Sequence, residues 1–177
     1  LINKDEELVA KETMLLTSKP VLYVCNVDED SAVNGNKYVE QVREAVKDEN
    51  AQVLIVAAKI ESEIAELETY EERQMFLEEM GLEESGVVRL IQRAYALLNL
   101  RTYFTAGADE CRAWTINVGD KAPKAGGVIH TDFVKGFIRA EVVHYNDLME
   151  LGSMTAAKEK GLVRSEGKEY VMKDGDI

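Results

Sequence analysis

The sequence contains few of the residues that mark disulfide scaffolds, zinc sites and proline-rich linkers. Its 177 residues include two cysteines and two prolines, too few for any of these classes. All of its apolar runs are much shorter than the roughly 18 residues that a membrane-spanning helix requires, and its first residues resemble neither a signal peptide nor a transit peptide. We therefore expect a protein of the reducing cytoplasm, and the absence of an initiating methionine predicts a fragment.

Acidic residues outnumber basic ones, and their distribution divides the chain. The sequence holds 33 acidic and 21 basic residues, a formal net charge of −12, and its 46% hydrophobic content is that of a folded protein. Residues 1–100 carry 21 acidic and 10 basic side chains, whereas residues 101–177 carry 12 and 11. The whole-chain charge argues against nucleic-acid binding, so a basic surface is expected only in the second part.

The order of elements in the first part predicts a parallel α/β fold. Continuous apolar runs at 21–25 and 52–58 are typical of strands that are covered on both faces. Between them, apolar residues at three- and four-residue intervals predict a helix over 36–48. Strand, helix and strand form a βαβ unit with a right-handed crossover. An additional helix over 4–17 is predicted to precede the first strand.

Residues 61–84 are predicted to form two short helices on the outside of the fold. They hold ten acidic residues and one basic residue. Thr69 begins a capping-box pattern, and Gly81 suits the left-handed position after a helix. Ser85 is predicted to cap a helix that runs to Leu100 and joins the two parts. A solvated acidic face is the simpler interpretation of these charges, and an interaction surface is the alternative.

The second part predicts a hairpin followed by a helix and further strands. Alternating segments at 102–105 and 111–118, joined by a tight loop, predict the hairpin. The remaining predicted elements are a loop over 119–127, a short helix near 131–135, a strand over 137–143, small helical pieces between 145 and 160, and a strand at 170–172. This order suits a ubiquitin-like β-grasp domain whose last strand would follow residue 176. Without that strand, the sheet edge at 102–105 is expected to lie open.

The ends of the two predicted parallel strands are the main candidates for chemistry, because open α/β sheets bind ligands there. The candidate residues are Asn26, Val27 and Glu29 after the first strand, and Ala57, Ala58 and Lys59 after the second. This order matches the base-recognition elements of P-loop GTPases, N-K-x-D and then S-A-K. Val27 replaces the usual Lys and Glu29 the usual Asp. An Asx turn among acidic loop residues is the alternative interpretation.

Four other residues invite a functional interpretation. His130 and Asp132 have the spacing of part of a catalytic relay, but no nucleophile accompanies them, and a helix cap by Asp132 with a loop contact by His130 is the simpler interpretation. Cys111 is reactive only if its pKa is lowered, so a passive strand residue is expected. Trp114 is expected in the core, with a base-stacking platform as the alternative.

The sequence resembles the YchF and Obg-like ATPases, which form a part of the Obg branch of P-loop GTPases. The resemblance spans nearly the whole chain and is most specific at residues 127–141, GVIHTDFVKGFIRAE. This segment is similar to the signature of the TGS domain, a β-grasp module. The resemblance implies that residues 1–100 are the C-terminal part of a nucleotide-binding domain with helical segments, and that residues 101–177 are a TGS domain that lacks its last strand.

The resemblance also implies a cofactor for the full-length protein, ATP or possibly GTP, with Mg²⁺. On the family pattern, the six candidate residues at the strand ends surround the base. The phosphate-binding loop G-x-x-x-x-G-K-[S/T] is absent from the sequence. Catalytic and phosphate-binding residues are therefore expected upstream of Leu1, and the fragment alone is expected to bind no nucleotide.

The implied partner is the ribosome, with the large subunit favoured, or another RNA surface. The candidate contact residues are the basic side chains around the predicted loop and helix of the second part: Lys121, Lys124, Lys135 and Arg139. The alternative function is a stand-alone TGS-type module that binds RNA or protein without enzymatic activity.

Overall fold

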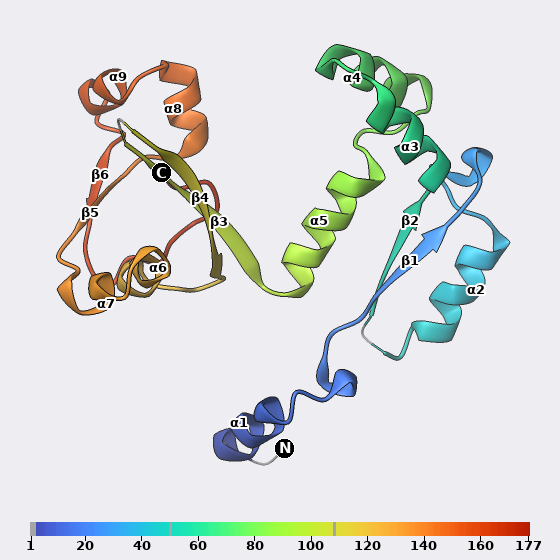
Figure 1. Ribbon diagram of the computed structural model, residues 1–177, viewed down its shortest axis with the longest axis horizontal. Coiled ribbons are helices and arrows are strands. Elements are labelled where there is room, and N and C mark those ends of the chain that lie inside the picture. The colour runs from blue at the N-terminus through green and yellow to red at the C-terminus, as the bar shows by residue number, and fades with distance from the viewer. Residues whose placement is uncertain (1–2, 50, 108) are drawn as a thin grey trace. The chain divides into compact units, whose positions relative to one another are not determined.

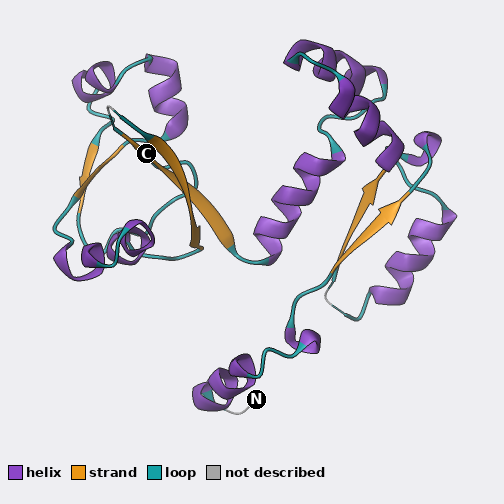
Figure 2. Cartoon of the chain, viewed as in Figure 1, coloured by secondary structure: helices purple, strands orange, loops and turns teal. Residues whose placement is uncertain are grey.

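The chain forms two compact units, Leu1–Leu98 and Asn99–Ile177. The computed structural model describes residues 3–49, 51–107 and 109–177. Both units combine helices with short strands, as Figures 1 and 2 show, so the fold is mixed α/β. Across these described residues, no helix combines the length and apolar character needed to cross a membrane.

The first unit is built around two parallel strands. Its elements are α1 (Lys4–Glu12), the 3₁₀ helix η1 (Leu16–Ser18), β1 (Leu22–Asn26), the 3₁₀ helix η2 (Glu29–Ser31), α2 (Lys37–Val46), β2 (Gln52–Val56), α3 (Ala58–Glu66), α4 (Tyr70–Glu79) and α5 (Gly86–Leu97). β1 pairs with β2 so that Asn26 lies opposite Val56. The two strands therefore end together, which places the loops that follow them side by side. Figure 1 shows α2 and α5 on either side of the strand pair.

Side-chain caps fix the helices of the first unit. Asn36 accepts hydrogen bonds from the first backbone N–H groups of α2. The predicted capping box at Thr69 and the predicted cap at Ser85 are both confirmed, and Gly81 has the predicted left-handed backbone with φ +69°. α3 begins at Ala58, earlier than predicted, and its N-cap residue Ala57 offers no side-chain acceptor.

The first unit buries Val39 and Val46 of α2 and Leu54 and Ile55 of β2, and a further buried cluster lies beyond the ends of the strands. It joins the loop after β1 to α3, α4 and the segment before α5, and its buried members are Ala32, Ala57, Ile60, Ile64, Leu77 and Leu82. Some apolar side chains of β1 and α5 are exposed to solvent. Val24 of β1 and Val87 and Ile91 of α5 are 48%, 52% and 53% exposed. Within the described residues, β1 has a strand partner on one side only.

The second unit begins with the predicted hairpin. Its elements are β3 (Leu100–Ala106), β4 (Cys111–Asn117), α6 (Ala122–Ile129), α7 (Asp132–Gly136), β5 (Ala140–Val142), α8 (Tyr145–Leu151), α9 (Met154–Glu159) and β6 (Arg164–Glu166). β3 and β4 are antiparallel, with Tyr103 opposite Trp114. Position 108 of the predicted tight loop lies outside the described residues. β5 pairs antiparallel with β6.

The prediction of a loop over 119–127 was wrong, because α6 occupies most of it. Pro123 lies in the first turn, where a helix tolerates proline, and Ala122 and Ala125 are buried. Gly126 and Gly127 of α6 leave room for the side chains of α7. A Cβ atom at Gly127 would lie 2.5 Å from Cγ2 of Val134.

Two strand predictions of the second unit need correction. The predicted strand over 137–143 is reduced to β5, and the predicted strand at 170–172 is a single bridge between Val171 and Lys121. The sequence did not indicate β6, because Arg164, Ser165 and Glu166 have no apolar alternation. Asp132 is also not the predicted cap, since Thr131 holds the N-cap position of α7.

The last residues of the chain run between β3 and the residue after β5. The N–H of Gly175 donates to Thr102 and the N–H of Phe104 donates to Asp176, at 2.9 and 2.7 Å. On the other side, Ile177 and Val143 exchange two backbone hydrogen bonds of 3.1 and 2.8 Å. Residues 175–177 therefore bridge two strands that have no direct pairing with each other among the described residues.

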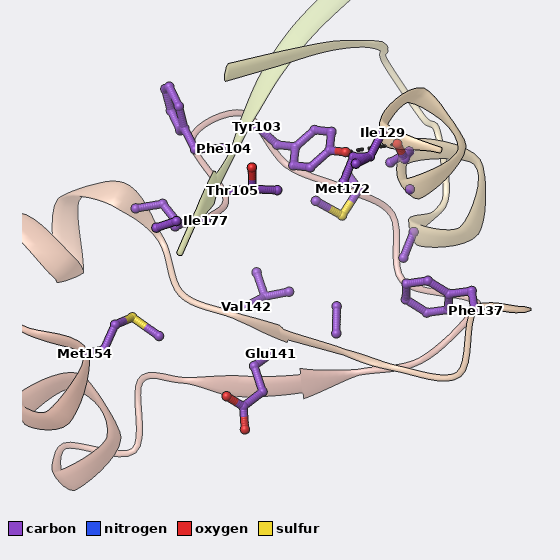
Figure 3. Close-up of a pocket in the computed structure, with 15 residues that line it drawn as sticks. Tyr103, Phe104, Thr105, Ile129, Phe137, Glu141, Val142, Met154, Met172 and Ile177 are labelled. Carbon is purple, nitrogen blue, oxygen red and sulfur yellow. Dashed lines mark hydrogen bonds between the residues drawn. The ribbon is translucent and has the colours of Figure 1, made fainter. Parts of the chain in front are cut away.

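Next to this bridge lies an apolar cavity of about 320 Å³. Figure 3 shows Tyr103, Ile129 and Met172 near one end of the cavity, with Val142, Met154 and Ile177 around the rest. Burial raises the pKa of Tyr103 to about 12, and its hydroxyl donates to the carbonyl of Ala125 at 2.9 Å. The open edge that was expected at 102–105 is thus covered at its first residues and borders a cavity further on.

Candidate functional site

Asn26 connects the ends of the two parallel strands. Its side-chain oxygen Oδ1 accepts a hydrogen bond from the backbone N–H of Ala58 at 3.0 Å. Because a backbone N–H is only a donor, the amide oxygen must face it, and the amide Nδ2 group is left without a described acceptor. Asn26 therefore caps α3 from another element, at the helix end where Ala57 provides no cap.

Lys59 connects Glu29 to α3. Its Nζ atom lies 3.3 Å from Oε2 of Glu29 and 3.7 Å from Oε1 of Glu63. The hydrogen bond with Glu29 and the charges of Glu29 and Glu63 raise the pKa of Lys59. The ammonium group therefore stays protonated at neutral pH and holds the two carboxylates together.

The other predicted site residues face the core. The Ala57 side chain is buried, and Val27 packs against the same core cluster. The backbone N–H of Val27 extends the sheet by donating to Val56 at 2.9 Å. The Asx turn that was weighed as the alternative occurs at Asp28, whose carboxylate accepts from the N–H of Ser31 at 3.0 Å. The structure therefore brings Asn26, Ala58, Glu29 and Lys59 together and directs Val27 and Ala57 inward.

The resulting donors and acceptors suit a planar ring with polar edges. The Nδ2 group of Asn26 is a free donor, and the carboxylate of Glu29 has an oxygen beyond the one that Lys59 engages. These groups lie at the carboxyl ends of two parallel strands, where α/β sheets bind ligands. Such donors and acceptors can bind a ligand through hydrogen bonds.

Glu61 belongs to the framework of this site, a role that the sequence analysis did not assign. Its two carboxylate oxygens accept from the backbone N–H groups of Gly86 and Val87, at 2.6 and 3.2 Å. A carboxylate at a helix N-terminus satisfies its free N–H groups and its positive end. Glu61 thereby joins α3 to the start of α5, and a Cβ at Gly86 would lie 2.8 Å from its oxygen. The 25-residue separation gives no local sequence signal.

The four basic candidates of the second unit fall into two pairs. Lys121 pairs with Glu169, and Lys124 pairs with Asp120 at 2.6 Å. Lys135 and Arg139 have no acidic partner among the described residues. Beside them, Phe133 and Val134 of α7 and Ile138 are 45%, 51% and 81% exposed. Of the four candidates, the two without a described ion pair therefore lie in or just after α7.

Asp120 is a buried acid that the sequence did not single out. Burial alone would raise the pKa of its carboxyl, but hydrogen bonds from Lys124 and from the N–H of Asn117 outweigh burial and lower the pKa. These contacts tie the turn after β4 to the first turn of α6. Lys124 is therefore engaged in a structural contact.

His130, Cys111 and Trp114 show no catalytic arrangement. His130 Nδ1 accepts from the backbone N–H of Asp132 at 3.3 Å, and the Asp132 side chain is 90% exposed. Cys111 is exposed at the start of β4. Trp114 packs beside the core of the second unit, and its indole N–H donates to the Thr105 hydroxyl at 2.9 Å. Trp114 is thus half-buried at the border of the core, and the Arg112 guanidinium lies 4.4 Å from its ring centroid.

The chain is similar to a family model and to several known proteins. The family model YchF-GTPase_C, described as a protein of unknown function (DUF933), matches residues 100–177. The chain is 57% identical over 176 residues to the ribosome-binding ATPase YchF of Bacillus subtilis (strain 168), covering 98% of this chain and 48% of that protein. It is 43% identical over 178 residues to Obg-like ATPase 1 of Rattus norvegicus, covering 99% and 44%.

The chain also aligns with a solved structure. The Schizosaccharomyces pombe YchF GTPase aligns with a TM-score of 0.81 at 35% identity, covering 99% of this chain and 47% of the other. The chain therefore spans about half the length of the relatives that it matches.

Proposed function

Because the chain belongs to the YchF and Obg-like ATPase family, we propose that it is the C-terminal half of an ATP-hydrolysing switch protein that associates with ribosomes. The contact between Asn26 and the N–H of Ala58 is the observation that carries this proposal. It joins the two candidate base-recognition segments, which are 32 residues apart in the sequence, at one edge of the sheet.

The proposed base is adenine. Both purines present the acceptor N7, but adenine places an amino donor beside it, whereas guanine places the acceptor O6 there. A free amide donor from Asn26 and a carboxylate acceptor from Glu29 suit adenine. The N–H of Ala58, a possible donor to guanine O6, is already used by Asn26. Guanine would leave its O6 facing an acceptor, and an unsatisfied polar group costs about 1 to 3 kcal/mol.

The chain's own residues fit the base but not the phosphates. Its sequence holds no phosphate-binding loop, so the rest of the full-length protein would supply phosphate contacts and Mg²⁺. Two features of the first unit support a larger domain around it: β1 has an open side within the described residues, and apolar side chains of α5 are exposed. The 177-residue chain alone is expected neither to hydrolyse ATP nor to bind it at micromolar concentration, since phosphate contacts supply much of the affinity.

The test of base recognition compares ATP and GTP dissociation constants for the full-length protein and an Asn26→Ala variant. We expect ATP to bind more tightly than GTP in the wild type and Asn26→Ala to weaken ATP binding by about tenfold, equivalent to 1.4 kcal/mol. Asn34→Ala, in an exposed turn close to η2, is the matched control and should leave binding unchanged. GTP binding tenfold more tightly than ATP would refute the proposed specificity.

For the second unit, we propose a TGS-type partner-binding arm that contacts the ribosome in the cytoplasm. Lys135 and Arg139, which have no described acidic partner, support an electrostatic contact with ribosomal RNA of the large subunit. Lys121 and Lys124 were proposed for the same contact, but their ion pairs with Glu169 and Asp120 reduce their availability. The relatives named ribosome-binding ATPase support the choice of partner.

Ribosome co-sedimentation of the full-length protein tests this contact. Replacing Lys135 and Arg139 by Glu should remove most binding and reduce the log–log salt slope by about 2, because two phosphate contacts are lost. The control replaces Lys160 and Lys168 by Glu, which makes the same charge change elsewhere on the unit. Undiminished binding of the Lys135 and Arg139 variant would place the contact on another surface.

A further inference from the structure

Lys59 occupies a position between two carboxylates at the edge of the proposed base site. Its Nζ atom is 3.3 Å from Glu29 and 3.7 Å from Glu63. Glu29 lies in η2, after β1, whereas Glu63 lies four residues after Lys59 on the same face of α3. The ammonium group therefore attaches a carboxylate of the first strand's loop to the helix that follows the second strand.

The contact with Lys59 engages only one of the two carboxylate oxygens of Glu29. Oε2 faces Lys59, and no described residue donates to Oε1. An ionised carboxylate accepts through both oxygens, so Glu29 can meet a ligand donor with one oxygen while Lys59 holds the other. The side chains of Lys59 and Glu29 are 73% and 46% exposed, and exposed pairs contribute little to folding stability. The effect of this pair is therefore expected in ligand binding.

We infer that Lys59, held by Glu63, is a positioning residue that directs Glu29 toward the amino group of adenine and so sharpens the preference for ATP over GTP. This inference rests on the function proposed above. Guanine carries its own donors at N1 and on C2, whereas the amino group of adenine is on C6, so the two sets of donors differ in position. A Glu29 side chain released from Lys59 can turn toward the guanine donors, whereas the anchored one is restricted.

The test measures ATP and GTP dissociation constants in the full-length protein carrying Lys59→Met or Lys59→Arg. Lys59→Met keeps most of the side-chain length and removes the charge. It should weaken ATP binding and strengthen GTP binding, so that the ATP preference falls by about fivefold, the upper end of what an exposed ion pair contributes. Lys59→Arg should restore the preference. Glu63→Gln should shift it in the same direction as Lys59→Met by a smaller factor.

The matched control is Lys47→Met, which removes an exposed ion pair with Glu44 on α2 and should leave both dissociation constants unchanged. A general structural defect would weaken both nucleotides, so opposite changes report on orientation. Equal weakening by Lys59→Met, or an unchanged ratio in a wild type that does prefer ATP, would overturn the inference alone. A wild type without ATP preference would overturn the proposed specificity and this inference with it.

Discussion

The two units differ in where they keep their carboxylates. In the first unit, the carboxylates of the site lie at the surface, and the side chain of Glu29 is 46% exposed. In the second unit, Asp120 and Asp176 are 7% and 0% exposed. Asp120 accepts from Lys124 and from the N–H of Asn117, and Asp176 accepts from Tyr170 and from the N–H of Lys173. A buried charge is costly unless it is paired, whereas an exposed one remains available. The difference indicates that buried charge serves folding in the second unit, whereas the site carboxylates of the first unit stay accessible at the surface.

Replacing Asp176 should lower the free energy of unfolding more than the other substitutions considered below. Its carboxylate accepts from the Tyr170 hydroxyl and the N–H of Lys173, each at 2.8 Å, and lies 3.5 Å from Arg164. Asp176→Ala leaves these groups unpaired, and we expect a loss of about 3 kcal/mol in the free energy of unfolding of the second unit. Urea denaturation followed by Trp114 fluorescence measures it. Asp132→Ala, at an exposed acid, is the control, and a loss below about 1 kcal/mol would contradict the comparison.

Glu61 is an exception among the carboxylates of the first unit, because it has a structural role. Glu61→Ala should lower the free energy of unfolding of the first unit by about 1 to 2 kcal/mol, since two N–H groups at the start of α5 lose their acceptor. Thermal unfolding monitored by circular dichroism is the measurement. Glu66→Ala on the same helix should be nearly silent; equal effects of the two variants would remove the special role of Glu61.

The lowered pKa of Asp120 predicts that the stability of the second unit depends on pH. Its pKa in the folded unit is lowered from the ordinary value of 3.8, so its stabilisation is complete above that value and is lost as pH falls through the folded pKa. Asp120→Asn should cost about 1 kcal/mol at pH 7 and progressively less below pH 4. Melting temperatures of the wild type and variant between pH 7 and 2.5 provide the test. Curves that stay parallel at all pH values would show that this charge is not linked to folding.

Asn26 should show the smallest stability effect. Asn26→Ala removes the acceptor for the N–H of Ala58, but this N–H is at the surface and water can replace the bond. We expect a loss of about 0.5 kcal/mol in the free energy of unfolding, in contrast to the tenfold weakening of ATP binding in the full-length protein. A stability loss as large as that of Glu61→Ala would make Asn26 a folding residue and break the distinction between the units.

The elements of the first unit could be predicted because each carries a local signal. The apolar runs at β1 and β2, the periodicity of α2 and the caps at Thr69 and Ser85 all appear in the structure as expected. α6 escaped prediction because its glycines are explained only by the neighbouring α7, a tertiary contact. β6 escaped because its three residues are polar and pair at an edge.

The candidate site was predictable in part for a related reason. The order of Asn26 and Ala58 along two adjacent parallel strands fixes their proximity, so the residues could be named from the sequence. The direction of each side chain could not be predicted, since Val27 packs against a core that is formed by helices distant in sequence. The contact of Glu61 with α5 likewise depends on tertiary packing.

The position of residues 174–177 has a consequence for how the second unit is made. The backbone N–H of Thr102, at the beginning of the unit, donates a hydrogen bond to the carboxylate of Asp174, 72 residues later. Contacts of such sequence separation slow folding, because a long loop must close before they form. During synthesis from the N-terminus, the hairpin of β3 and β4 emerges before the rest of the unit but stays incomplete until residues 174–177 follow. The second unit is therefore expected to fold late, after its last residues have left the ribosomal tunnel.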